Sequence, residues 1–196
     1  MYMTVLRATA DTIKNAEYMM DFDDGDYIHH WLTSQVHTDR ADAQILYRII
    51  KGPEAIYLYV QSKDTFPEKN IKRAGMELLK SFETGDPGDR PVTFNIFCSP
   101  NKTIFCPDSN KSKKQFLIDP AERKEWLEKK LSPFMSNITI IEDHIDNMLI
   151  KNGKKIRGAY FTGTGKITDL QKYREAVAKG FGDCKCYGMG LLLCKG

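Results

Sequence analysis

Residues 180–196 read Gly180-Phe-Gly-Asp-Cys-Lys-Cys-Tyr-Gly-Met-Gly-Leu-Leu-Leu-Cys-Lys-Gly196. This glycine-rich tail places four glycines around Lys185: Gly180, Gly182, Gly188 and Gly190. Glycine has no Cβ and adopts positive φ at little cost, so such a loop can approach a bulky partner closely. The central lysine indicates an anionic partner. The apolar run at residues 191–193 predicts a strand that anchors the loop to a core.

Known phosphate-binding motifs do not account for the tail. Its pattern G-x-G-x-x-K differs from the dinucleotide fingerprint, and it follows a predicted helix and precedes a strand, the reverse of the Rossmann order. The segment ending Gly165-Lys166-Ile167 also fails as a P-loop, because Tyr160 and Ile167 replace the required glycine and hydroxyl. The alternative that these glycines only form turns suits Gly180 as the residue after a helix, but leaves the other glycines unexplained.

Charge divides the chain into two halves. Residues 1–89 hold 10 lysines and arginines against 15 aspartates and glutamates, a net charge of −5. Residues 90–196 hold 19 against 11, a net charge of +8. The sign changes at the Gly- and Pro-containing break Thr84-Gly-Asp-Pro-Gly-Asp89. This asymmetry favours a polyanionic partner for the second half over a chance scatter of solvated charges.

Composition also limits the compartment and the cofactors. The N-terminal residues lack the basic and apolar regions of a signal peptide, and no run is long enough to span a membrane, so we expect a soluble cytoplasmic protein. The five cysteines form no CxxC pair, so we expect reduced thiols. Cys184-x-Cys186 alone is too sparse for a zinc site, and we expect no metal and no cofactor.

Hydrophobic patterning predicts strands and helices in a similar order in both halves. In the first half we expect strands at residues 2–8, 44–51 and 55–61, helices at 27–36 and 67–82, and room for a short fourth strand. In the second half we expect strands at residues 91–98, 137–141, 158–162 and 191–194, and a hairpin within 99–115.

Two capping boxes mark the helices of the second half: Asp119-Pro-Ala-Glu122 and Thr168-Asp-Leu-Gln171, the latter helix ending at Gly180. Both halves therefore follow a β-α-β-β-α-β outline. This pattern indicates an α+β fold of two tandem ferredoxin-like (RRM-like) domains, residues 1–86 and residues 90–196.

The helix expected at residues 27–36 has two distinct faces. One face is apolar and would pack on the sheet: Ile28, Trp31, Leu32 and Val36, with Gln35. The opposite face presents Tyr27, His30, Ser34 and His37 within a narrow arc. Histidine can act as a general acid or base near neutral pH, although a solvated polar face explains the same pattern.

Basic residues of the second half cluster in predicted loops. They are Lys102, Lys111, Lys113 and Lys114, then Lys151, Lys154, Lys155 and Arg157, then Lys185. Lysines and arginines supply affinity for phosphates, and RNA hairpins are recognised largely through shape and backbone. These loops favour an RNA partner.

Several of these stretches occur together in one known family. The glycine spacing of the tail and Trp126-Leu127 are the most specific. The others are Met1-Tyr2, Tyr27-x-x-His30, Arg40-Ala-Asp42-Ala43, Ile45-Leu46-Tyr47, Lys113-Lys114, Pro120-Ala-Glu122 and Phe161-Thr-Gly163. Over nearly its whole length the chain resembles the CRISPR repeat-processing endoribonucleases of the CasE type.

The resemblance implies metal-independent cleavage of CRISPR repeat RNA hairpins in precursor CRISPR RNA, with 2′,3′-cyclic phosphate and 5′-OH ends. It implies retention in the Cascade antiviral complex with other Cascade subunits. His30 matches the catalytic histidine of the family, and Tyr27 its partner tyrosine. The implied RNA contacts are the basic residues Lys102, Lys111, Lys113, Lys114, Lys154, Lys155, Arg157 and Lys185, with the backbone at Gly182 and Gly188.

Two other functions remain open from the residues. A non-catalytic RNA-hairpin-binding protein of the same fold could stack bases on exposed aromatic side chains of its sheet, such as Tyr47, Tyr57 and Tyr59. A ferredoxin-like protein that binds a metal or a small molecule could use Cys184 and Cys186. Cleavage and metal content distinguish these functions.

Overall fold

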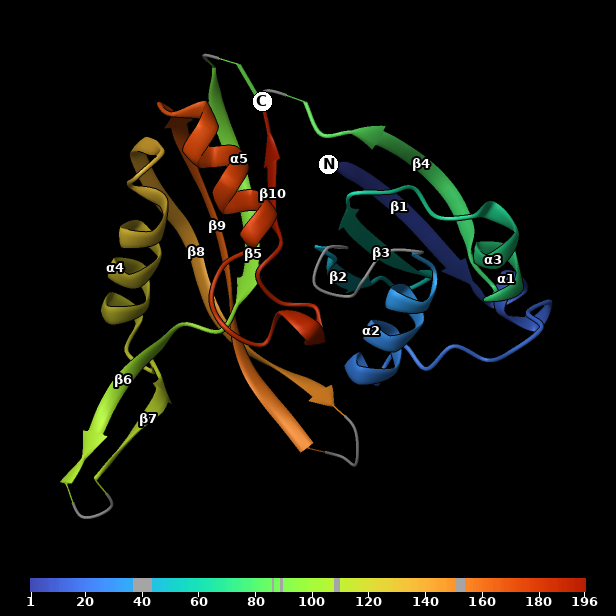
Figure 1. Ribbon diagram of the computed structural model, residues 1–196, viewed down its shortest axis with the longest axis horizontal. Coiled ribbons are helices and arrows are strands. Elements are labelled where there is room, and N and C mark those ends of the chain that lie inside the picture. The colour runs from blue at the N-terminus through green and yellow to red at the C-terminus, as the bar shows by residue number, and fades with distance from the viewer. Residues whose placement is uncertain (37–43, 86, 89, 108–109, 151–153) are drawn as a thin grey trace.

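The computed structural model describes residues 1–36, 44–85, 87–88, 90–107, 110–150 and 154–196 (Figure 1). Within them the chain forms two four-stranded antiparallel sheets and one separate two-stranded hairpin. The α+β fold with two ferredoxin-like units is confirmed. Residues 37–43, which include His37 and the whole Arg40-Ala-Asp42-Ala43 motif, lie outside the described residues, as does Lys151.

The first sheet is built from residues before the break, in the order β2-β3-β1-β4. Its elements are β1 (Tyr2–Thr9), α1 (Ala10–Lys14), α2 (Gly25–Ser34), β2 (Leu46–Lys51), β3 (Ala55–Ser62), α3 (Glu68–Arg73) and β4 (Glu77–Glu83). Helices α2 and α3 cover one face, because their apolar residues share a core with β1, β2 and β3. That core includes Leu6, Ile28, Leu32, Tyr47, Leu58 and Ile71.

The second sheet has the order β10-β5-β9-β8. Its chain segment contains β5 (Pro91–Cys98), β6 (Asn101–Cys106), β7 (Lys111–Phe116), α4 (Pro120–Leu131), β8 (Met135–Ile150), β9 (Lys154–Ile167), α5 (Leu170–Lys179), the 3₁₀-helix η3 (Lys185–Tyr187) and β10 (Leu192–Lys195). The hairpin β6–β7 projects away from both sheets, and the tail passes beside α2 (Figure 1).

The predicted helix at residues 67–82 is wrong in its second half. Helix α3 ends at Arg73, and Gly75 takes a positive φ of +69°, where a Cβ would lie 2.8 Å from Ala16 Cβ. Residues after Gly75 then pair with β1 as strand β4, with Leu78 opposite Leu6. The free edge of β1 overrides the helical periodicity, since tertiary pairing outweighs weak local propensity.

Three further features of the fold differ from the sequence prediction. The N-cap of α5 is Asp169, whose carboxylate accepts a hydrogen bond from the Lys172 amide at 3.0 Å, and not Thr168. Strands β8 and β9 form a long ribbon that extends well beyond residues 137–141 and 158–162. The short helix α1 was not predicted; Thr9 and Thr12 cap it reciprocally.

The two sheets meet through buried polar contacts and a small apolar cluster. Gln61 Nε2 donates to the Val177 carbonyl at 3.0 Å. The Arg48 guanidinium donates to Asn95 Oδ1 and lies 4.7 Å from the centre of the Tyr160 ring. The apolar cluster comprises Met3, Leu46 and Leu191, with Tyr59 and Leu193. These contacts join the two sheets.

Candidate catalytic helix and RNA-binding groove

Helix α2 exposes Tyr27, His30 and Ser34, the described residues of its predicted polar face. Asp24 caps the helix by accepting hydrogen bonds from the amides of Asp26 and Tyr27 at 2.9 and 3.1 Å. On the inner face Ile28 and Leu32 are fully buried. Tyr27 and His30 lie on the outside, one turn apart. An imidazole and a phenol therefore share one solvent-accessible helix face.

Two contacts define the surroundings of this pair. The Nε2 atom of His30 lies 3.7 Å from Asp26 Oδ2, a pairing along one helical turn. The Tyr27 phenol donates to the Met19 carbonyl at 3.4 Å. A carboxylate, an imidazole and a phenol therefore lie close together on α2, and an imidazole can act as a general acid or base.

The tail packs directly against α2. Its helix η3 contacts α2 and β2. Tyr47 links the two, because its phenol lies 2.6 Å from the Gly25 carbonyl and 2.9 Å from the Cys186 carbonyl. The neighbouring Cys186 thiol, partial burial and the Asp26 carboxylate together raise the pKa of Tyr187. The tail thus reaches the same end of α2 that carries Asp26.

A groove of about 430 Å³ opens where the tail meets the hairpin, α4 and α5. We call it the lysine groove after the four lysines that line it: Lys114, Lys130, Lys179 and Lys185. Trp126 and Gly182 also line it. The Lys130 ammonium lies 5.7 Å from the centre of the Trp126 ring, so an aromatic surface accompanies the charges. Such a surface suits a polyanion with exposed bases.

The tail holds its place in the groove through Asp183 and Gly182. Asp183 pairs with the Lys114 ammonium and accepts a hydrogen bond from Asn101 Nδ2 at 3.2 Å. Gly182 has a φ of +72°, and a Cβ there would lie 3.0 Å from the Ser99 carbonyl oxygen. Only glycine fits this close approach without strain. The tail and the hairpin are therefore joined at the groove.

Lys185 is a partly buried lysine of the groove. Its ammonium donates to the Lys179 carbonyl at 2.9 Å. Burial and the nearby Lys179 charge lower its pKa, although Asp183 opposes them. A cation whose charge is disfavoured in the free protein gains from an added anion.

The structure brings together only some of the sequence-predicted RNA contacts. Lys114, Lys185 and Gly182 share the lysine groove. Lys111 and Lys113 are exposed along β7, and Lys102 pairs with Glu122 at 2.7 Å. Arg157 lies 5.8 Å from the centre of the Phe116 ring, Lys155 is exposed on β9, and Gly188 is buried with a φ of +81°. The side chain of Lys154 lies outside the described residues.

The sequence analysis did not include Lys130 and Lys179 among the candidate RNA contacts. Both lie in helices, at positions where the local sequence pattern is typical of an ordinary solvated face. The feature of the sequence that could have identified them is their position in the last turns of α4 and α5, with Lys179 directly before the tail.

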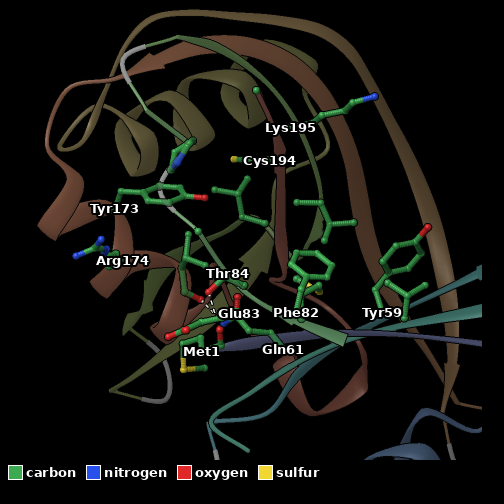
Figure 2. Close-up of a pocket in the computed structure, with 18 of the residues that line it drawn as sticks. Met1, Tyr59, Gln61, Phe82, Glu83, Thr84, Tyr173, Arg174, Cys194 and Lys195 are labelled. Atoms are coloured by element: carbon green, nitrogen blue, oxygen red, sulfur yellow. Dashed lines mark hydrogen bonds between the residues drawn. The ribbon is translucent and has the colours of Figure 1, made fainter. Parts of the chain in front are cut away.

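A second hollow lies between the two sheets, away from α2. It measures about 880 Å³, and neither Tyr27 nor His30 lines it. Figure 2 shows Tyr173 and Arg174 of α5 on one side and Tyr59 and Phe82 of the first sheet on the other. Tyr47 is fully buried, so the suggestion that it stacks bases is wrong. Of the three candidates for stacking, Tyr59 lines this hollow.

The two cysteines of the tail motif, Cys184 and Cys186, are partly buried thiols. Burial and Asp183 raise the pKa of the Cys184 thiol, which disfavours the thiolate that metals bind. Among the residues that the structure describes, no group of three or more His, Cys, Asp or Glu side chains could hold a metal ion. None of the described helices is long and apolar enough to cross a membrane.

Comparisons with known proteins agree on the fold. A family model described as "CRISPR associated protein" matches residues 1–195, whereas no curated protein matches the sequence. A structure of CRISPR endoribonuclease Cse3 bound to 19 nt RNA has a TM-score of 0.77 and 18% identity, covering 100% of both chains. Cas6e from Escherichia coli K-12 has a TM-score of 0.68 and 21% identity, covering 99% of this chain and 98% of that one.

A chain of a CRISPR RNA-guided surveillance complex, in a pre-nicking state, is also similar. Its TM-score is 0.68 and its identity 21%, covering 99% of both chains. At these identities the likeness establishes a shared fold over the full length of the chain.

Proposed function

Because the chain belongs to the CRISPR associated protein family, we propose that it is a metal-independent endoribonuclease that cleaves CRISPR repeat RNA hairpins in precursor CRISPR RNA. The observation that most supports this proposal is that the tail lines the lysine groove and also packs against the helix that exposes Tyr27 and His30. An RNA held in the groove would then lie against the tail, next to the helix that carries the acid–base groups. The similar fold of an RNA-bound endoribonuclease supports the assignment.

In the proposed reaction the 2′-oxygen attacks the adjacent phosphorus and the bond from phosphorus to the 5′-oxygen breaks. A base removes the 2′-hydroxyl proton and an acid protonates the departing 5′-oxygen. His30 acts as general acid or base, and Tyr27 orients the phosphate or transfers the other proton. The products are a 2′,3′-cyclic phosphate and a 5′-OH, and no oxidant or water is consumed.

The protein's own contribution beyond acid–base catalysis is to hold the RNA in line for attack. Fixing the 2′-oxygen, the phosphorus and the 5′-oxygen in one line converts flexible RNA into a reactive conformer. In this proposal residues 90–196 form the domain that binds the RNA hairpin, mainly through the lysine groove and the protein β-hairpin β6–β7. Residues 1–86 form the domain that carries the cutting groups.

We also propose that the protein stays with its product as a subunit of the Cascade antiviral complex in the cytoplasm. A similarly folded chain is present in a CRISPR RNA-guided surveillance complex, which supports this assembly. The proposed phosphate contacts lie on the RNA hairpin itself, and the bond that is cut lies beside the hairpin. Cleavage therefore removes none of these contacts.

The test is cleavage of a repeat RNA hairpin by purified protein in the presence of EDTA. We expect one cut, with 2′,3′-cyclic phosphate and 5′-OH ends. A single 2′-deoxy nucleotide directly upstream of the cut should block it, whereas the same substitution elsewhere in the hairpin should not. A requirement for magnesium would contradict the mechanism. Binding without cleavage would favour the non-catalytic RNA-hairpin-binding protein.

A further inference from the structure

Tyr47 joins the proposed catalytic helix to the tail through one buried phenol. It lies on β2, is fully buried, and its hydroxyl lies 2.6 Å from the carbonyl of Gly25 and 2.9 Å from that of Cys186. Gly25 is the first residue of α2, and Cys186 is the central residue of η3. One O–H group is therefore shared between two carbonyl oxygens that are far apart in sequence.

The phenol is a dependable donor at this position. Burial is the largest of the factors that raise its pKa far above the usual range, and the Cys186 thiol and the acidic residues at the start of α2 add to it. The hydroxyl therefore keeps its proton over the whole working range of pH. A buried donor of this kind is costly to leave without an acceptor, so the hydroxyl stays hydrogen-bonded to at least one of the two carbonyls.

Strand β2 supports the tail at a second point. The methyl groups of Leu46, the residue before Tyr47, lie 2.8 and 2.9 Å from where a Cβ on Gly180 would stand. The start of the tail and its 3₁₀-helix thus both rest on the same strand. Strand β2 therefore contacts the tail at two points, and through the Tyr47 hydroxyl it also contacts the first turn of α2.

The position of this contact matters for the reaction. Lys185, next to Cys186, lines the lysine groove, and Tyr27 is two residues after Gly25 on α2. The hydroxyl of Tyr47 therefore lies between the residues that would hold RNA and the residues that would cut it. Small misplacements of reacting groups cost far more in rate than in affinity.

We propose that Tyr47 is a positioning residue, which fixes the distance between the RNA-bound tail and the proposed catalytic face of α2. This inference rests on the proposed endoribonuclease function. Tyr47 touches neither the RNA nor the reacting atoms. It acts through the backbone of Gly25 and Cys186, so its loss affects the rate of cleavage and leaves the affinity for RNA almost intact.

The test replaces Tyr47 by phenylalanine, which removes only the hydroxyl. The matched control is Tyr2→Phe, a partly buried tyrosine of β1 outside the lysine groove and α2. Three quantities are measured: the single-turnover cleavage rate at saturating RNA, the Kd for a repeat RNA with a 2′-deoxy nucleotide at the cut, and amide hydrogen exchange in the RNA-free protein.

For Tyr47→Phe we expect a rate loss of roughly tenfold, as suits a small displacement of the reacting groups, and a Kd within about twofold of wild type. Exchange should quicken together at the start of α2 and at residues 185–188. Tyr2→Phe should change none of the three. Any one of three results would overturn the proposal. They are an unchanged cleavage rate, a rate loss matched by the loss of RNA affinity, and faster amide exchange at only one of the two segments.

The remaining outcomes are equally informative. If Tyr47→Phe fails to fold, the contact is structural and the positioning role is wrong. If wild-type protein does not cleave the RNA, the proposed function fails, whereas the exchange experiment still decides whether Tyr47 couples α2 to the tail.

Discussion

The imidazole of His30 lies 3.7 Å from the carboxylate of Asp26, one helical turn earlier on α2. The carboxylate is about two-thirds buried and the imidazole is mostly exposed, with side-chain exposures of 29% and 61%. Asp26 is thus held in place while His30 remains open to a substrate. This pair gives the proposed acid–base group a fixed electrostatic partner.

Asp26→Asn should slow cleavage, because it removes the negative charge that lies 3.7 Å from the His30 imidazole and keeps the shape of the side chain. An exposed ion pair of this kind is worth at most about 1 kcal/mol, so we expect up to roughly a fivefold loss in single-turnover rate with RNA affinity unchanged. Asp23→Asn removes the same charge from the same acidic segment and should leave the rate near wild type. Equal rates in both variants would exclude a role for Asp26.

Lys185→Ala should weaken RNA binding and lower its dependence on salt. Removing one phosphate contact lowers the slope of log K against log salt by about 0.7 to 0.9. A titration of repeat RNA at several salt concentrations measures this. The control is Lys63→Ala, an exposed lysine of the first half. An identical slope in the two variants would remove Lys185 from the RNA interface.

RNA binding should also depend on pH through Lys185. Because burial and Lys179 lower its pKa, this lysine loses its charge at a lower pH than an exposed lysine, whose pKa is 10.5. Affinity should therefore fall as the pH rises toward 10.5. In Lys185→Arg, whose guanidinium stays protonated, the fall should be smaller. Parallel curves for wild type and Lys185→Arg would contradict this.

Arg123→Ala should destabilise the second half strongly. Arg123 forms a two-pronged pair with Asp143, with both N–O distances at 2.8 Å and side-chain exposures of 4% and 2%. Removing the arginine leaves Asp143 buried without its countercharge, which costs about 3–5 kcal/mol. Urea denaturation measures the change, and Lys124→Ala, at a partly exposed neighbour on α4, should cost far less. A loss below about 1 kcal/mol for Arg123→Ala would contradict the buried pair.

Gly190→Ala should destabilise the protein where the tail enters β10. Gly190 has a φ of +85°, and a Cβ would lie 2.5 Å from the Phe181 carbonyl oxygen. The positive φ alone costs about 1–2 kcal/mol, and the clash adds to it. Gly85→Ala is the control, because nothing lies within 4 Å of its added Cβ. Thermal denaturation should show a clear loss for Gly190→Ala and almost none for Gly85→Ala.

Local sequence patterns predicted much of the fold for a physical reason. Strands such as β2 and β3 and helices such as α2 bury one regular face, so their periodicity is visible in the sequence. Strand β4 was missed because its identity depends on pairing with β1, a contact between distant segments. The α5 cap was misplaced by one residue, because Thr168 and Asp169 are both good capping residues.

The candidate site was only partly predictable for a similar reason. Tyr27 and His30 share one helix, so their common face follows from spacing alone. The lysine groove combines residues of β7, α4, α5 and the tail, and no local pattern connects Lys114 with Lys130 or Lys179. In the sequence, nothing distinguishes Tyr47 from other strand tyrosines in this respect. Only the folded chain places its hydroxyl between α2 and the tail.

The most direct test is single-turnover cleavage of repeat RNA in EDTA by wild type, His30→Ala and the control His29→Gln. We predict that His30→Ala loses at least about 100-fold in rate while its affinity for the RNA stays near that of wild type, and that His29→Gln still cleaves. If His30→Ala cleaves at the wild-type rate, His30 is not the acid–base group and the central claim is wrong.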